Sequence, residues 1–110
     1  MPEIKVPKVL PFGRHDWDIE LDGVIGDKYN KAGILDTENL ILKLSSKSLP
    51  SVLSATLLHE LVHLIDWTFL GERLSESEVS SFSNGLYLLL TQLGVTFDFS
   101  ELKEERDGSN

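Results

Sequence analysis

The chain has 110 residues, of which 18 are acidic and 10 are basic, so its formal net charge is −8 at pH 7. This length supports one hydrophobic core, and we predict a single domain over residues 1–110. The excess of acidic residues excludes a nucleic-acid backbone and an anionic membrane surface as main partners, because a protein that binds either needs a positively charged surface. The sequence has neither an apolar run that could span a membrane nor a secretory signal, which predicts a cytoplasmic protein without a membrane partner.

Cysteine is absent, which excludes disulfides, cysteine-ligated metal and a catalytic thiol. Any chemistry must therefore come from His, Asp, Glu, Ser or Tyr. Residues 1–13 contain three prolines and predict an extended N-terminal arm. Residues 99–110 are rich in charge and predict a flexible acidic tail.

The first half of the chain has the pattern of strands. Residues 16–22 alternate apolar and acidic side chains, which is typical of a half-buried strand. A second, weaker strand is predicted within Val24–Leu35. A third is predicted over Leu40–Leu44, where the leucines alternate with Ile41 and Lys43, so that one face is partly polar. The expected product is a small, mainly antiparallel sheet of about three strands.

After residue 48 the apolar spacing changes to three or four residues, which indicates helices. Ser48 is the predicted N-cap of a first helix with Pro50 in its first turn, and Gly71 is its predicted left-handed C-cap. A second helix is predicted from Ser75 to about Gln92, and the short connection makes the two helices antiparallel. The second helix has an apolar stripe that is expected to face the core, formed by Val79, Phe82, Leu86, Leu89, Leu90 and Leu93. The predicted fold class is therefore α+β, with two long helices after the sheet.

The first predicted helix contains the segment His59-Glu60-Leu61-Val62-His63. Residues four apart lie on one face of a helix, so both imidazoles can bind the same metal ion. Glu60 points about 100° away from His59, beside the metal, where it can take a proton from a metal-bound water. The alternative is a pair of ordinary helix histidines, which is costly in so apolar a helix. The segment therefore predicts a Zn²⁺ site with Glu60 as the catalytic base.

Zinc held by two histidines needs at least one more protein ligand. A third histidine ligand of the longer zinc motif HExxHxxGxxH is excluded, because this chain has Asp66 in place of its glycine and Phe69 in place of its last histidine. The start of the second helix offers two carboxylates, Glu76 and Glu78. Glu76 projects towards the buried side and is the favoured ligand, whereas Glu78 completes a capping box with Ser75 and is the alternative ligand.

With these residues the chain resembles the gluzincin clan of zinc metallopeptidases, in which an HExxH helix is followed by a helix that carries a glutamate ligand. It is most similar to the small single-domain members, the minigluzincins, and to small phage and archaeal relatives. Three segments carry the resemblance: His59–Asp66, Leu74–Val79 and Gly85–Tyr87. The layout of strands before helices covers most of residues 16–95.

The resemblance implies roles for particular residues. His59, His63 and Glu76 would bind zinc, and Glu60 would act as general base. An edge strand would line the cleft and pair with the substrate, a peptide or a protein, as an added strand. The candidate for that edge is Leu40–Leu44.

One departure from the clan concerns the group that orients a ligand histidine. Larger members place an acidic residue four positions after the ligand glutamate, and this chain has Ser80 there. Asp66 is predicted to take that role instead, because it follows His63 by three positions and His59 by seven. A carboxylate that accepts the outer ring N–H fixes the tautomer of a ligand histidine.

The second departure concerns the group that stabilises the oxyanion. Tyr29, His15 and Arg73 are the candidates in this chain. Tyr87 lies too far along the second helix to serve and is expected to pack in the interior.

The predicted activity is a zinc-dependent endopeptidase that hydrolyses peptide bonds through a zinc-bound water activated by Glu60. The arm and the tail are long enough to lie in a cleft, so we also expect a latent zymogen, blocked by a terminal segment of the same chain or of a self-associated copy. The alternative is a non-catalytic, zinc-stabilised scaffold or pseudoenzyme that serves as a binding module. The missing oxyanion donor favours this alternative, and Glu60 argues against it, because a structural zinc site needs no base.

Overall fold

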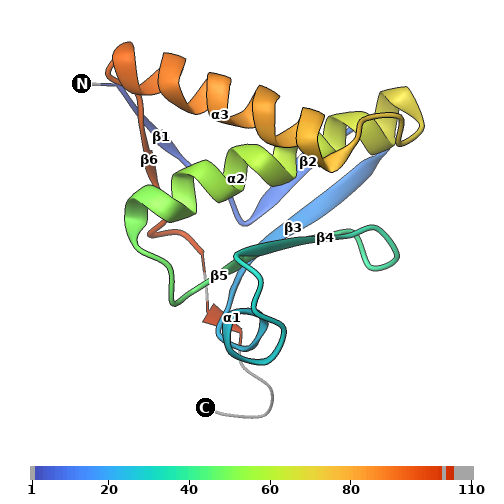
Figure 1. Cartoon of the computed structure of the whole chain (residues 1–110). Coiled ribbons are helices and arrows are strands. Elements are labelled where there is room, and N and C mark those ends of the chain that lie inside the picture. Colours follow the sequence, from blue (N-terminus) through green and yellow to red (C-terminus); the bar gives the residue numbers. More distant parts are fainter. Residues whose placement is uncertain (1, 103, 106–110) are drawn as a thin grey trace.

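The structure is a computed structural model that describes residues 2–102 and 104–105. It has the predicted α+β class, with mixed sheets and helices (Figure 1). The elements in chain order are β1 (Glu3–Lys5), β2 (Val9–Phe12), β3 (His15–Asp22), α1 (Val24–Lys28), β4 (Gly33–Asp36), β5 (Ile41–Ser45), α2 (Pro50–Ile65), the π-helix η1 (Asp66–Leu70), α3 (Glu76–Gln92), β6 (Thr96–Asp98) and β7 (Glu104–Glu105).

The larger sheet has the strand order β2-β3-β5-β4, and β7 pairs with the end of β3. The pairs β2–β3 and β4–β5 are antiparallel, whereas β3 runs parallel to both β5 and β7. The expectation of a mainly antiparallel sheet of about three strands was therefore wrong. The chain leaves β3, passes through α1, forms β4 at the outer edge and returns in β5 between its two neighbours.

The edge strand next to β5 is β4, and β2 is the edge strand on the other side of the sheet. Leu42 in β5 pairs with Ile19 of β3 on one side and with Leu35 of β4 on the other. The prediction of Leu40–Leu44 as the edge strand was therefore wrong, and Gly33–Asp36 has the free edge. Apolar alternation marks a strand but carries no information on the order of strands in a sheet, which depends on long-range pairing.

The segment Val24–Leu35, predicted as one weak strand, is divided between two elements. Residues 24–28 form the helix α1, because the carboxylate of Asp22 accepts hydrogen bonds from the amides of Val24 (2.7 Å) and Ile25 (3.3 Å). Such a side chain satisfies the first free amides of a helix and favours its start. The strand is confined to the last part of the segment, where β4 begins at Gly33.

Described segments near both ends of the chain take part in the fold, and residues 1–13, predicted as an extended arm, contribute the two paired strands β1 and β2. β1 pairs in parallel with β6, β2 pairs with β3, and Val6 between them is buried in the core. Within the predicted tail, Leu102 is also buried in the core, and β7 pairs in parallel with the end of β3. Residue 103 and residues 106–110 of that tail lie outside the described residues.

The two long helices form where the sequence predicts them. Pro50 occupies the first turn of α2, although the N-cap is Leu49 rather than Ser48. Gly71 has the predicted left-handed conformation (φ 68°) after the π-helix, and Ser75 caps α3. In Figure 1, α2 lies between α3 and the strands β4 and β5, so two faces of α2 are covered.

The apolar stripe of α3 is not the core face that the sequence predicts. Val79 is fully buried, but Phe82, Leu89 and Leu93 are 61%, 62% and 71% exposed. The reason is the layer order: α3 packs against α2, and the sheet lies on another side of α2 (Figure 1). The small side chain of Ser83 takes part in the contact instead, and it is buried. Among the described helices none is both long and apolar enough to cross a membrane.

Candidate metal centre

Two histidines of α2 form the base of the site. His59 and His63 lie one turn apart, and their rings meet edge to face with centroids 4.9 Å apart. Their side chains are 26% and 29% exposed, so both reach solvent, although the sheet and α3 cover two faces of this helix. The predicted one-face arrangement is confirmed in geometry.

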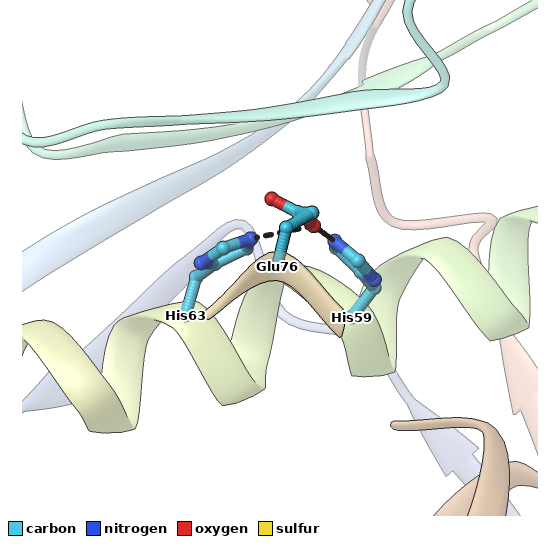
Figure 2. A group of neighbouring side chains, drawn as sticks. All are labelled: His59, His63 and Glu76. Carbon is cyan, nitrogen blue, oxygen red and sulfur yellow. Dashed lines mark hydrogen bonds and ion pairs between the residues drawn. The ribbon is translucent and has the colours of Figure 1, made fainter. Parts of the chain in front are cut away.

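The carboxylate of Glu76 lies between the two imidazoles. Its Oε1 atom is 2.6 Å from Nε2 of His59 and 3.3 Å from Nε2 of His63. Figure 2 shows both rings on the same side of α2, with this carboxylate directed at them from the start of α3. Burial works to raise the pKa of the Glu76 carboxyl, but His63 and His59 outweigh it, and the pKa falls below its ordinary value.

These three side chains suit a divalent cation. Their ligand atoms all lie within 4.8 Å of one another, and two imidazoles with one carboxylate are a common donor set for zinc. Around a tetrahedral zinc the ligand atoms lie about 3.3 Å apart, so the close pair of His59 and Glu76 has to open by less than about 1 Å. Glu76 can make this adjustment, because its side chain is 69% exposed.

Asp66 holds the segment that delivers Glu76. Its buried carboxylate accepts hydrogen bonds from the amides of Arg73 (2.9 Å) and Leu74 (3.2 Å), and its carbonyl accepts one from the amide of Glu72 (3.2 Å). These bonds fix the loop between the π-helix and α3. Asp66 was predicted to orient a ligand histidine. In the structure its carboxylate instead accepts hydrogen bonds from backbone amides of the loop.

Glu78, the alternative ligand, lies in the capping box that the sequence predicts. Its carboxylate accepts a hydrogen bond from the amide of Ser75 (2.8 Å), and the Ser75 hydroxyl accepts one from the amide of Glu78 (3.1 Å). The structure therefore brings Glu76, and not Glu78, to the histidines. The capping box fixes the first turn of α3, and with it the direction of Glu76.

Glu60 is buried beside the cluster, on the face of α2 that meets β4. A Cβ atom built on Gly33 of β4 would lie 3.1 Å from both Cγ and Oε2 of Glu60. Burial raises the pKa of the Glu60 carboxyl, against the lowering effect of His63 and His59. A carboxylate whose pKa lies above its ordinary value, next to a site for a cation, is suited to proton transfer.

The cluster opens into a cleft of about 650 Å³ between β4, α2 and α3. Gly33 and Lys31 line one wall, Thr56 lies on the floor, and Ser83 lies on the side of α3. Sequence reasoning missed Gly33 and Lys31, because neither belongs to a local motif. The positively charged side chain of Lys31 is part of this wall, and its charge works to lower the pKa of the Glu60 carboxyl.

The three candidates for oxyanion stabilisation lie elsewhere. Tyr29 is 58% exposed at the end of α1, and the His15 ring contacts Trp67 with centroids 6.3 Å apart. Arg73 belongs to the loop that Asp66 holds. Within the described part of the chain, none of these three is among the residues that line the cleft. Tyr87 is half-buried on α3.

The described residues that line the cleft all lie between Lys31 and Asn84. Residues 3–5 and 9–12 are paired in sheets and are not among the described residues that line the cleft, so the expected block by a terminal segment stays a prediction. A block by residues 106–110 falls outside the described residues.

Searches of protein-family models, of curated proteins and of solved structures find no match to this chain.

Proposed function

We propose that this chain is a zinc-dependent endopeptidase of the gluzincin type. One observation carries the proposal: the ligand atoms of His59, His63 and Glu76 converge beside the buried carboxylate of Glu60, at the floor of an open cleft. Three protein ligands leave one position of a tetrahedral zinc for a water molecule, which is the arrangement of catalytic sites. Zinc bound there would polarise a peptide carbonyl and lower the pKa of a water molecule to about 7.

The residues of this chain then have distinct tasks. Glu60 takes a proton from the attacking water and returns it to the amine that leaves. Its burial supports this role, because a raised pKa brings the carboxyl closer to the pH at which it works. The free edge of β4 offers backbone N–H and C=O groups to an extended substrate, with Gly33 beside Glu60. In this proposal β4 takes the role for which the sequence predicted Leu40–Leu44.

Cleavage of a diverse peptide pool by the zinc-loaded protein, followed by mass spectrometry, tests this function. The control is Glu60→Gln with a matched zinc content, because this variant keeps the shape of the side chain and loses the base. We expect cuts from the wild type and at least a hundredfold fewer from the variant, the usual contribution of a general base. Cuts of equal rate in both proteins would contradict the role of Glu60.

The second candidate is a zinc-stabilised scaffold or pseudoenzyme that acts as a binding module. It is supported by the position of Tyr29, His15 and Arg73, none of which is among the described residues that line the cleft. The same experiment separates the two functions. Zinc bound at one ion per chain, without cleavage of any peptide, favours the scaffold.

A further inference from the structure

The flank of α3 away from the cleft has a regular row of exposed apolar side chains. Phe82, Leu86, Leu89 and Leu93 follow one another at intervals of four, three and four residues, and they are 61%, 40%, 62% and 71% exposed. This interval is the heptad spacing of helices that pack side by side. We call these four residues the α3 seam.

The charged residues of α3 are confined to its first turn, where Glu78 lies one turn before Phe82. Residues 79–97 contain no Asp, Glu, Lys or Arg, although the chain as a whole carries a net charge of −8. A symmetric contact brings each surface into contact with its own copy, so a charged seam would repel itself and an uncharged one does not. The lack of Lys and Arg also argues against an anionic membrane as the occupant, because such surfaces attract basic segments.

We infer that the α3 seam is the interface of a homodimer, in which the seams of two copies pack against each other. The four side chains expose about 400 Å² on each copy, as expected for large apolar residues of this exposure. With the polar residues around them, two copies would bury about 1,200 Å², the lower end of the range for specific interfaces. The dimer should therefore form at micromolar concentrations and separate on dilution.

The seam and the cleft lie on different sides of α3. Glu76, Ser83 and Asn84 line the cleft, and Val79 and Ser83 are buried. On a helix of 3.6 residues per turn, the seam is rotated by about 110° from the direction of Glu76. Both clefts of the dimer stay open, so this inference does not depend on the proposed function, and metal binding should be the same in monomer and dimer.

Sedimentation velocity tests the dimer with a matched pair of variants on neighbouring residues. Leu88 and Leu89 have nearly the same exposure, 61% and 62%, but Leu88 faces away from α2 and lies outside the seam. Leu89→Glu and Leu88→Glu change the net charge by the same amount on the same helix. Phe82→Glu places the same charge at the other end of the seam.

We expect the wild type to change from 12.3 kDa to twice that mass as its concentration rises from about 1 to about 300 µM, the range of a small interface. Leu89→Glu and Phe82→Glu should weaken the dimer at least tenfold, and Leu88→Glu less than threefold. Far-UV circular dichroism shows whether the variants remain folded. A wild type that is monomeric throughout overturns the inference, as does an equal loss in Leu88→Glu. Binding of the monomeric wild type to phosphatidylcholine vesicles would assign the seam to a lipid surface and also overturn it.

Discussion

Gly33 on the edge strand β4 and Glu60 on α2 lie next to each other in the lining of the cleft. A Cβ atom on Gly33 would lie 3.1 Å from Cγ and Oε2 of Glu60, and 2.6 Å from Cγ2 of Thr56. The glycine therefore lets the strand approach the helix closely enough to cover Glu60. The burial of that carboxylate, which raises its pKa, depends in part on this close approach.

Gly33→Ala should displace β4 or the side chains of Thr56 and Glu60. We expect a loss of about 1–3 kcal/mol in the free energy of unfolding, as for overpacked interiors. Peptide cleavage should fall while zinc binding stays near that of the wild type, since Gly33 is not one of the three residues of the donor set. Urea unfolding and zinc titration measure the two effects.

Gly85→Ala is the matched control, because a Cβ atom on this helical glycine would meet no atom within 4 Å. It should raise stability by up to about 1 kcal/mol through its helix propensity. If Gly33→Ala behaved like Gly85→Ala in both measurements, the close approach would have no role.

Asp66 acts on the metal site through the loop that precedes α3. Asp66→Ala would leave the amides of Arg73 and Leu74 without their acceptor, at a cost of about 1 kcal/mol for each of these partly buried donors. Because this loop places Glu76, we expect zinc affinity to fall about 10- to 100-fold, the range for groups that hold a metal ligand. Competition with a fluorescent chelator measures the affinity. An affinity equal to that of the wild type would show that Glu76 is positioned by the capping box alone.

The turn between β4 and β5 predicts a pH dependence of stability. Asp36 accepts hydrogen bonds from the side chain of Asn39 (2.9 Å) and from the amides of Asn39 and Glu38 (3.1 Å each), and these lower the pKa of its carboxyl from the ordinary 3.8. A carboxyl with a lowered pKa in the folded state stabilises the fold above pH 3.8 and loses this effect as the pH falls through its folded pKa.

Asp36→Asn should therefore be less stable than the wild type by about 0.5 kcal/mol at neutral pH, a small value because the group is exposed. The difference should close as the pH falls below 3.8 and through the lowered pKa of the folded state. Urea unfolding at a series of pH values measures it, and the effect should shrink in an Asn39→Ala background. A difference that stays constant down to pH 2 would show that the charge of Asp36 has no part in it.

Features that depend on neighbouring residues were predictable from the sequence. The two histidines share a face, Gly71 ends the first long helix in the left-handed conformation, and Ser75 with Glu78 forms the capping box. Each of these depends on a spacing of a few positions, where backbone geometry alone sets which groups meet.

Features that depend on distant pairing were not. The order of the strands places β5 inside the sheet, which no alternation of residues reveals, and so the wall of the cleft was assigned to the wrong strand. The contact of Gly33 with Glu60 joins residues 27 positions apart, and neither residue signals the other. The apolar stripe of α3 was predictable from its spacing, but its exposure to solvent was not. Periodicity shows that one face of a helix is apolar and does not show what packs against that face.

Zinc binding by the purified protein decides whether His59, His63 and Glu76 form a metal site. Calorimetry measures the affinity, and elemental analysis measures the number of ions per chain. Glu76→Gln and Glu78→Gln are the decisive pair, because they make the same change two positions apart on α3. In the described contacts, Glu76 meets both histidines, whereas Glu78 meets the amide of Ser75. We predict one zinc per chain for the wild type and for Glu78→Gln, and binding at least tenfold weaker for Glu76→Gln. A wild type that binds no zinc, or a loss confined to Glu78→Gln, would contradict the account.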